Sequence, residues 1–213
     1  MTILLDLMQE IYEKYDEFTP AELNLGGGFG IRYDMNKLPV EYGIFLRPMM
    51  KMICAKYMDW GVPFPALVIE PGRSIVGEAG TTLYTVGTIK EIPGVRKYVA
   101  LDGGMTDNIR PALYGAEYTC IDASCPDYYG MEMEKVTLCG NACESGDVII
   151  KDVELPKLKR GDLIAVNSTG AYGYSMASNY NMRRRPAVVM IEDNKPKLII
   201  KRESLDDLTK NDI

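Results

Sequence analysis

The hydrophobic pattern of this chain changes near Thr81, and that change limits the folds the sequence can adopt. Before Thr81, amphipathic segments alternate with short apolar runs that end in glycine-rich turns, the order expected of parallel strands joined by helices. After it, short alternating runs are separated by turns, which is typical of antiparallel sheets. We therefore predict an α/β domain over residues 1–81 and an all-β domain over residues 82–213.

The elements of the first domain follow from its apolar spacing. The run Leu67-Val68-Ile69 is unbroken, as in strands buried on both faces of a parallel sheet. Ser74 is expected to cap a short helix that runs through Ala79. The other predicted elements are helices over residues 1–15 and 39–60 and a strand over residues 23–25.

The second domain is predicted to be built from short strands. Asp193 and Asn194 separate the last two and predict a hairpin. One turn of helix is expected over residues 205–210. The predicted strands cover residues 82–92, 97–102, 118–123, 134–138, 162–168, 187–192 and 197–201.

Composition excludes several classes of protein. The 213 residues, 46% hydrophobic and 25% charged, are typical of a soluble globular protein. The 24 basic against 30 acidic residues give a net charge of −6, which would repel a nucleic-acid backbone, and the run Arg183–Arg185 is too short to reverse this. No apolar run reaches the roughly 18 residues of a membrane span, and we expect neither a membrane anchor nor a signal peptide.

Histidine is absent, and the cysteines are odd in number and irregularly spaced. The five cysteines form no CxxC pair, so no zinc site is expected, and we interpret them as reduced thiols of a cytoplasmic protein. Because histidine is the usual general base near neutral pH, its absence excludes Ser-His-Asp and Cys-His sites within this chain.

Two glycine-bearing turns follow the predicted strands of the first domain. Gly26–Gly30 and Glu70–Arg73 each come directly after an apolar run. Such turns expose backbone N–H groups that suit a phosphate, although a tight turn alone would use the same residues. Neither segment has the pattern of a P-loop or of a dinucleotide fingerprint. In a (β/α)₈ barrel, successive strand ends open on one face, so two such turns together favour a phosphate site.

Five short motifs between Leu23 and Pro186 carry a family resemblance. They are Leu25-Gly26-Gly27-Gly28-Phe29-Gly30, Glu70-Pro71-Gly72-Arg73, Arg110-Pro111-Ala112-Leu113-Tyr114, Cys143-Glu144-Ser145-Gly146-Asp147 and Gly170-Ala171-Tyr172-Gly173. In order and spacing they resemble the diaminopimelate decarboxylases, pyridoxal phosphate enzymes with an alanine-racemase-like barrel followed by a β-domain. The resemblance implies the last βα units of a (β/α)₈ barrel and then an antiparallel β-domain.

The resemblance also implies how the cofactor would be held. Gly28 and Gly72 would give backbone donors to the phosphate of pyridoxal 5'-phosphate, within a motif that includes Pro71. Glu70 would keep the pyridine nitrogen protonated, so that the ring can accept electrons when carbon dioxide leaves. Tyr172 would contact cofactor and substrate from the second domain.

A further set of residues is implied to bind the amino-acid substrate. Arg73 and Arg110, with Tyr114, would hold its distal carboxylate, because a guanidinium fork matches two oxygens. Glu144 would accept the distal ammonium. Cys143 would return a proton to the substrate carbon, reaching it from the partner subunit of a homodimer.

Part of the family's pattern is not found before Gly26. A barrel takes typically ~250 residues, and the first domain holds roughly two βα units. The family's cofactor lysine and its ring-stacking histidine lie in the unmatched part. Lys14, the only lysine before Gly26, is on the polar face of a helix and is not expected to bind the cofactor. We expect the chain to be the C-terminal portion of such an enzyme, inactive by itself.

Two other interpretations stay open from the sequence. The chain could be a non-catalytic dimerisation or binding module, since the cofactor lysine is missing. It could also belong to a decarboxylase of a related substrate, such as ornithine, arginine or a carboxypolyamine. Glutamate rather than aspartate after Cys143 favours diaminopimelate, because ornithine decarboxylases carry aspartate there.

Overall fold

The computed structural model describes residues 1–15, 18–33 and 38–213. These residues form two compact units. The first contains the described residues of 1–31 and 38–75, and the second contains residues 32–33 and 76–213. The assignment of residues 1–81 to the end of a barrel and of 82–213 to a separate sheet domain stays a prediction.

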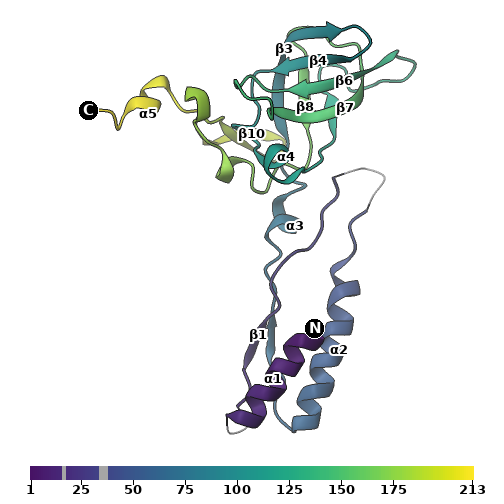
Figure 1. Ribbon diagram of the computed structural model, residues 1–213, viewed down its shortest axis with the longest axis vertical. Helices are drawn as coiled ribbons and strands as arrows, with labels where there is room; N and C mark the ends of the chain where they lie inside the picture. Colours follow the sequence, from purple (N-terminus) through teal and green to yellow (C-terminus); the bar gives the residue numbers. More distant parts are fainter. Residues whose placement is uncertain (16–17, 34–37) are drawn as a thin grey trace. The chain divides into compact units, whose positions relative to one another are not determined.

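The first unit is a parallel strand pair with two helices (Figure 1). Strands β1 (Glu22–Asn24) and β2 (Ala66–Val68) pair in parallel, with Leu23 opposite Leu67. The connection between them contains α2 (Tyr42–Trp60), and α1 (Thr2–Lys14) precedes β1, as predicted. Apolar side chains from both helices and from β1 form the core, namely Leu5, Met8, Leu23, Ile53 and Tyr57.

The short helix α3 (Gly72–Val76) differs from its prediction. It begins at Gly72 and ends at Val76, so the expected cap Ser74 lies inside it and the helix does not reach Ala79. The Ser74 hydroxyl donates to the carbonyl of Pro71 at 2.6 Å. A serine can satisfy a nearby carbonyl in this way from within a first turn, which the cap rule does not foresee.

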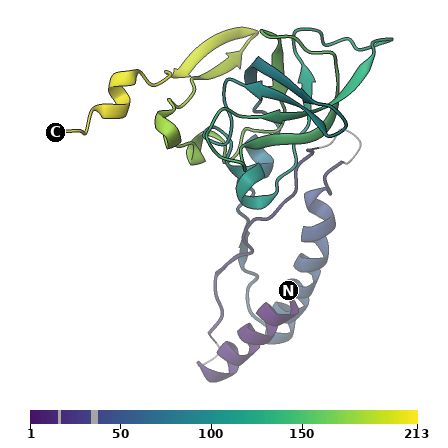
Figure 2. The same ribbon diagram turned by 45° about the horizontal axis from the view of Figure 1, so that its top comes forward.

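The second unit is built on a six-stranded sheet with the order β5-β8-β3-β4-β6-β7. The two edge strands, β5 and β7, contact each other, so the sheet curls into a nearly closed form (Figures 1 and 2). The strands are β3 (Thr82–Ile92), β4 (Arg96–Leu101), β5 (Cys120–Asp122), β6 (Met133–Cys139), β7 (Val148–Pro156) and β8 (Leu163–Val166). The enclosed core contains Tyr84, Val86, Val99, Leu101, Tyr118, Val136, Leu138, Ile149, Leu155, Leu158, Ile164 and Val166.

The prediction of an antiparallel domain is wrong for one strand pair and incomplete for another strand. β4 and β6 run parallel, with Val99 opposite Leu138, because the chain passes through α4 (Arg110–Tyr114) and β5 between them. β7 was not predicted, since Lys151 and Asp152 interrupt its apolar pattern. The structure accommodates them where the β6–β7 register shifts, with Asp152 at a φ of 54°.

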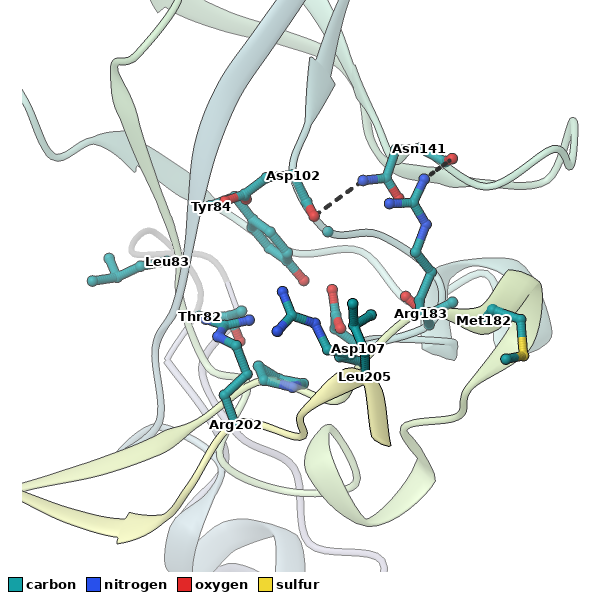
Figure 3. Close-up of a pocket in the computed structure, with 14 residues that line it drawn as sticks. Thr82, Leu83, Tyr84, Asp102, Asp107, Asn141, Met182, Arg183, Arg202 and Leu205 are labelled. Carbon is teal, nitrogen blue, oxygen red and sulfur yellow. Dashed lines mark hydrogen bonds between the residues drawn. The ribbon is translucent and has the colours of Figure 1, made fainter. Parts of the chain in front are cut away.

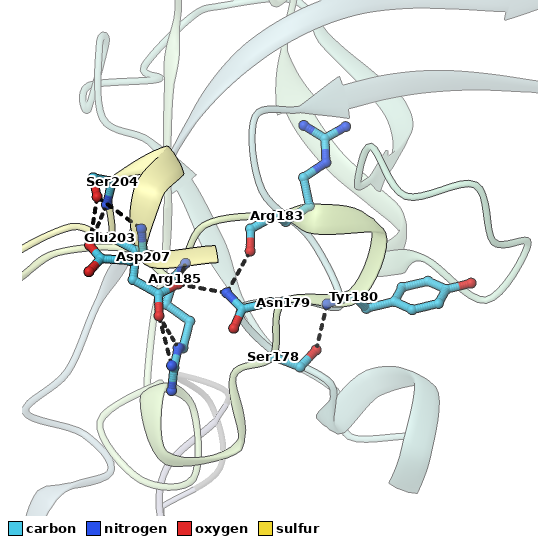
Figure 4. Close-up of polar contacts among 8 residues, drawn as sticks. All are labelled: Ser178, Asn179, Tyr180, Arg183, Arg185, Glu203, Ser204 and Asp207. Atoms are coloured by element: carbon cyan, nitrogen blue, oxygen red, sulfur yellow. Dashed lines mark hydrogen bonds and ion pairs between the residues drawn. The ribbon is translucent and has the colours of Figure 1, made fainter. Parts of the chain in front are cut away.

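The C-terminal residues form a hairpin and a capped helix. β9 (Val188–Glu192) and β10 (Lys195–Ile200) pair through Asp193 and Asn194, which have φ angles of 49° and 59°. Positive φ at both turn residues is the geometry that hairpins prefer, so this prediction is confirmed. Helix α5 (Leu205–Thr209) is closed by a capping box between Ser204 and Asp207 (Figure 4). Within the described residues, no helix combines the length and apolarity needed to cross a bilayer.

Candidate functional site

The turns that follow β1 and β2 meet at one end of the parallel pair. The Glu70 N–H donates to the Gly26 carbonyl at 2.8 Å. The Asn24 side chain donates to the Glu70 carboxylate at 2.6 Å and accepts from the Gly26 N–H at 2.8 Å. One asparagine therefore holds both the glycine loop and the carboxylate of the next motif.

Two positions of this loop, 27 and 28, require glycine for different structural reasons. A Cβ at Gly27 would lie 2.3 Å from the Glu70 carbonyl oxygen, so only glycine allows this close approach. Gly28 has a φ of 88°, which is unfavourable for residues with side chains. Both are exposed, and neither N–H has a hydrogen-bond partner among the described residues. Exposed, unpartnered N–H groups fit the phosphate of a cofactor.

The predicted cofactor residues of the first unit are thus brought together. Pro71 and Gly72 follow Glu70 directly, and Gly72 begins α3. Gly28, Glu70 and Pro71 lie on the turns after two neighbouring parallel strands, and Gly72 and Arg73 are the first two residues of α3.

In the second unit, Arg110 lies within a group of tyrosines. Its guanidinium carbon is 5.4 Å from the centre of the Tyr114 ring and 5.3 Å from that of Tyr172, so both rings make cation–π contacts with it. Its Nε donates to the Tyr118 hydroxyl at 3.1 Å. The ring of Tyr118 packs edge-on against that of Tyr33, with ring centres 5.4 Å apart. Burial raises the pKa of Tyr118, an effect that the nearby Arg110 partly offsets.

The loop that carries Tyr172 is set by close backbone contacts. Thr169 N–H donates to the Gly80 carbonyl at 2.9 Å, and a Cβ at Gly170 would lie 1.9 Å from the Val76 carbonyl oxygen. Tyr172 itself has a φ of 61°, a left-handed conformation that costs roughly 1–2 kcal/mol for a residue with a side chain. The fold holds this strained residue so that its ring lies against Arg110.

Cys143 and Glu144 lie on a separate loop, between β6 and β7. Both are exposed. The Cys143 N–H donates to the Asn181 side chain at 3.0 Å, and the Glu144 carboxylate accepts from the Gly146 N–H at 3.2 Å. Among the described residues, no hydrogen bond, ion pair or ring contact joins this loop's Cys143 or Glu144 to the Arg110 group.

A cavity of about 310 Å³ in the second unit is lined by none of the predicted site residues (Figure 3). The Tyr84 hydroxyl and the Asp107 carboxylate point toward it, and burial is the main cause that raises the pKa of each. Arg202 lies near Asp107 and partly lowers its pKa. Among the described residues, no three acidic or cysteine side chains are placed to hold a metal ion.

Comparison with known proteins places the chain in a family. The model of the C-terminal sheet domain of pyridoxal-dependent decarboxylases matches residues 10–170. The chain belongs to this family. The predicted family and fold class are therefore confirmed, including the alanine-racemase-like sheet domain.

Individual members of the pyridoxal-dependent decarboxylases are similar along nearly the whole chain. Diaminopimelate decarboxylase of Bacillus subtilis is 49% identical over 212 residues, which cover 96% of this chain and 48% of the relative. The Staphylococcus aureus enzyme of the same name is 51% identical over 193 residues, covering 89% and 45%. The chain thus spans about half the length of the curated relatives it matches.

Solved structures of pyridoxal-dependent decarboxylases agree with the fold. The diaminopimelate decarboxylase of M. jannaschii, solved in complex with L-lysine, has a TM-score of 0.88 and 40% identity, covering 98% of this chain and 46% of that one. The lysine/ornithine decarboxylase of Vibrio vulnificus with cadaverine has a TM-score of 0.69 and 27% identity, covering 84% and 46%.

Several residues that shape the site were not found from the sequence. Asn24, Tyr118, Asp147 and Asn181 act through contacts with distant loops or with backbone groups. Asn24 carries a usable signal, since it is a polar residue at the carboxyl end of a parallel strand, two positions before a glycine loop, and ligands of α/β folds bind at such strand ends.

Proposed function

We propose that this chain supplies part of the active site of a pyridoxal phosphate enzyme that converts meso-2,6-diaminopimelate to L-lysine and carbon dioxide. The observation that carries the proposal is the junction of Glu70 with the glycine loop, held by Asn24. This junction offers N–H donors for a phosphate beside a fixed carboxylate. The names of the similar enzymes support the substrate.

The first unit would bind the cofactor. The N–H groups of Gly27, Gly28 and Gly72 would donate to the phosphate, and Glu70 would hold a proton at the pyridine nitrogen. Pyridoxal phosphate, when bound, supplies an electron sink for the pair left behind as carbon dioxide departs. Asn24 occupies one oxygen of Glu70, which leaves the other oxygen for this task.

The second unit would bind the far end of the substrate. The Arg110 guanidinium, with Tyr114 beside it and with Arg73, would hold the distal carboxylate. Glu144 would accept the distal ammonium, and the Cys143 thiol would give a proton to the substrate carbon. Among the described residues, no hydrogen bond or ring contact joins Cys143 to the Arg110 group. We propose that Cys143 acts on the site of a second copy in a homodimer working in the cytoplasm.

The test uses the protein as its gene encodes it. After incubation with pyridoxal phosphate, borohydride reduction and peptide mapping are expected to find one adduct on a single lysine. Carbon dioxide release is then measured with diaminopimelate, ornithine and arginine. We expect release from diaminopimelate, and its loss in Arg110→Gln with the lysine adduct retained.

Other outcomes favour the alternatives. A preference for ornithine or arginine would identify a related decarboxylase and contradict the assignment of Glu144 and Arg110. A protein that forms no adduct and releases no carbon dioxide would be a non-catalytic binding or dimerisation module.

A further inference from the structure

The buried carboxylate of Asp147 binds two separate loops of the second unit. One oxygen accepts from the Met105 N–H at 2.7 Å, and the other accepts from the Ala142 N–H at 2.8 Å. The residue is 4% exposed. Both oxygens therefore have backbone partners from chain segments that lie on opposite sides of β5 and β6 in the sequence.

Two glycines make room for this carboxylate. A Cβ at Gly104 would lie 2.4 Å from one Asp147 oxygen, and a Cβ at Gly140 would lie 2.2 Å from both. Real Cβ atoms do not approach oxygen so closely. The segments thus meet the carboxylate at glycines, which allows their backbones to come within hydrogen-bond distance of it.

Each bound segment leads directly to residues of the proposed site. The segment of Met105 continues into α4, which begins at Arg110. The loop of Ala142 continues into Cys143 and Glu144. The backbone of Asp147 also makes two hydrogen bonds within this loop. Asp147 N–H donates to the Glu144 carbonyl at 3.1 Å, and its carbonyl accepts from Gly140 N–H at 2.9 Å.

We propose that Asp147 is a positioning residue that fixes the Cys143–Glu144 loop to the segment leading into Arg110. This role rests on the proposed function for its catalytic consequence, but not for its structural one. Asp147 itself touches no substrate, because its carboxylate is buried and occupied by backbone donors. A misplacement of about 1 Å at such residues can cost about 100-fold in rate.

Hydrogen exchange of the gene-encoded protein tests the structural part. In Asp147→Ala both acceptors are lost, and exchange is expected to accelerate about tenfold in residues 102–108 and 140–147 together. Asp147→Asn keeps one acceptor, so its effect is expected to be smaller and to spare one of the two segments. Asn is nearly isosteric, so this variant serves if the alanine variant fails to fold.

Asp162→Asn is the matched control. Asp162 is also buried, at 7% exposure, and its carboxylate accepts from the Lys159 N–H at 2.7 Å, within its own turn. This variant is expected to leave exchange at both segments unchanged. Acceleration confined to residues 140–147 in Asp147→Ala, or spread evenly over the whole sheet, would overturn the proposal.

Steady-state kinetics test the catalytic consequence of the proposal separately from hydrogen exchange. In Asp147→Asn the kcat for diaminopimelate is expected to fall about tenfold or more, with Asp162→Asn close to wild type. An unchanged kcat in Asp147→Asn would overturn the positioning role even if exchange changes. If the wild-type protein has no decarboxylase activity, the proposed function fails while the exchange result still decides whether Asp147 joins the loops.

Discussion

The Tyr118 hydroxyl accepts a hydrogen bond from Nε of Arg110 at 3.1 Å, and this contact determines which edge of the guanidinium is left for a ligand. A guanidinium has five N–H donors in one plane. With Nε–H occupied, a carboxylate can be held by a pair of parallel bonds only at the edge formed by the two Nη atoms. Because Tyr118 is buried against the sheet core, the orientation of Arg110 is set by the fold.

Tyr118→Phe is therefore expected to weaken binding of a substrate carboxylate. The ring and its packing against Tyr33 remain, but Arg110 loses the partner of its Nε. A hydrogen bond to a charged group contributes about 1.5–3 kcal/mol, so the KM for diaminopimelate should rise about tenfold or more while kcat changes little. Tyr129→Phe, at a ring that is 97% exposed, is the control. Equal KM values in steady-state assays of the two variants would contradict this role.

Gly28→Ala is expected to weaken cofactor binding. Nothing lies within 4 Å of a Cβ at this position, so the cost is the φ of 88° alone, roughly 1–2 kcal/mol. The loop should relax away from this conformation and move its N–H groups. An absorbance titration should give a Kd for pyridoxal phosphate about tenfold higher than that of wild type.

Gly30→Ala is the matched control for the cofactor loop. This glycine also has open space at its Cβ, but its φ lies outside the left-handed region. Its Kd should match that of wild type. A similar loss in both variants would mean that the added methyl group, and not the backbone conformation of Gly28, affects the cofactor.

The sequence could predict those parts of the site that are formed by short contiguous motifs. The apolar run before Gly26 and the one before Glu70 end in turns, and parallel pairing then requires those turns to meet. The roles of Tyr118 and Asp147 could not be predicted in this way. Asp147 binds a residue 42 positions away, and no local pattern specifies that pairing.

The same reasoning explains the errors in the fold. Local alternation identifies a strand but does not give the direction of its neighbour, so the parallel pairing of β4 with β6 was not foreseen. Helix α4 has five residues, too few for a helical period to appear, although Gly115 at a φ of 61° ends it in the usual way. Both features depend on tertiary packing.

The pairing of Glu203 with Arg185 predicts how the C-terminal segment responds to acid. Glu203 accepts from the Arg185 side chain at 2.7 and 2.9 Å, and from its N–H at 2.8 Å (Figure 4). These hydrogen bonds lower the pKa of Glu203 to about 2. The unfolded value is about 4.3, so the stabilisation is fully present above that pH and is lost as the pH falls toward 2.

Glu203→Gln tests this dependence. The variant should unfold at a lower temperature than wild type at pH 7, and the difference should shrink between about pH 4.5 and 2. Glu192→Gln is the control, since Glu192 pairs with Lys197 at 3.5 Å on an exposed hairpin. A difference between Glu203→Gln and wild type that is constant across this pH range would contradict the assignment.

Gly140→Ala is expected to destabilise the second unit by about 1–3 kcal/mol, the usual cost of forcing an extra carbon into a packed site. The Cβ of the new alanine would lie 2.2 Å from both carboxylate oxygens of Asp147. Hydrogen bonds from two backbone N–H groups hold these oxygens in place, so the carboxylate cannot shift without losing them. Gly146→Ala, in the same loop, meets only the Glu144 side chain at 3.8 Å and should change stability by less than about 0.5 kcal/mol. Urea unfolding monitored by far-UV circular dichroism compares the two. If Gly140→Ala unfolds at the same urea concentration as Gly146→Ala, the carboxylate of Asp147 does not fill the space that the structure gives it, and the loop contacts described for it do not hold in solution.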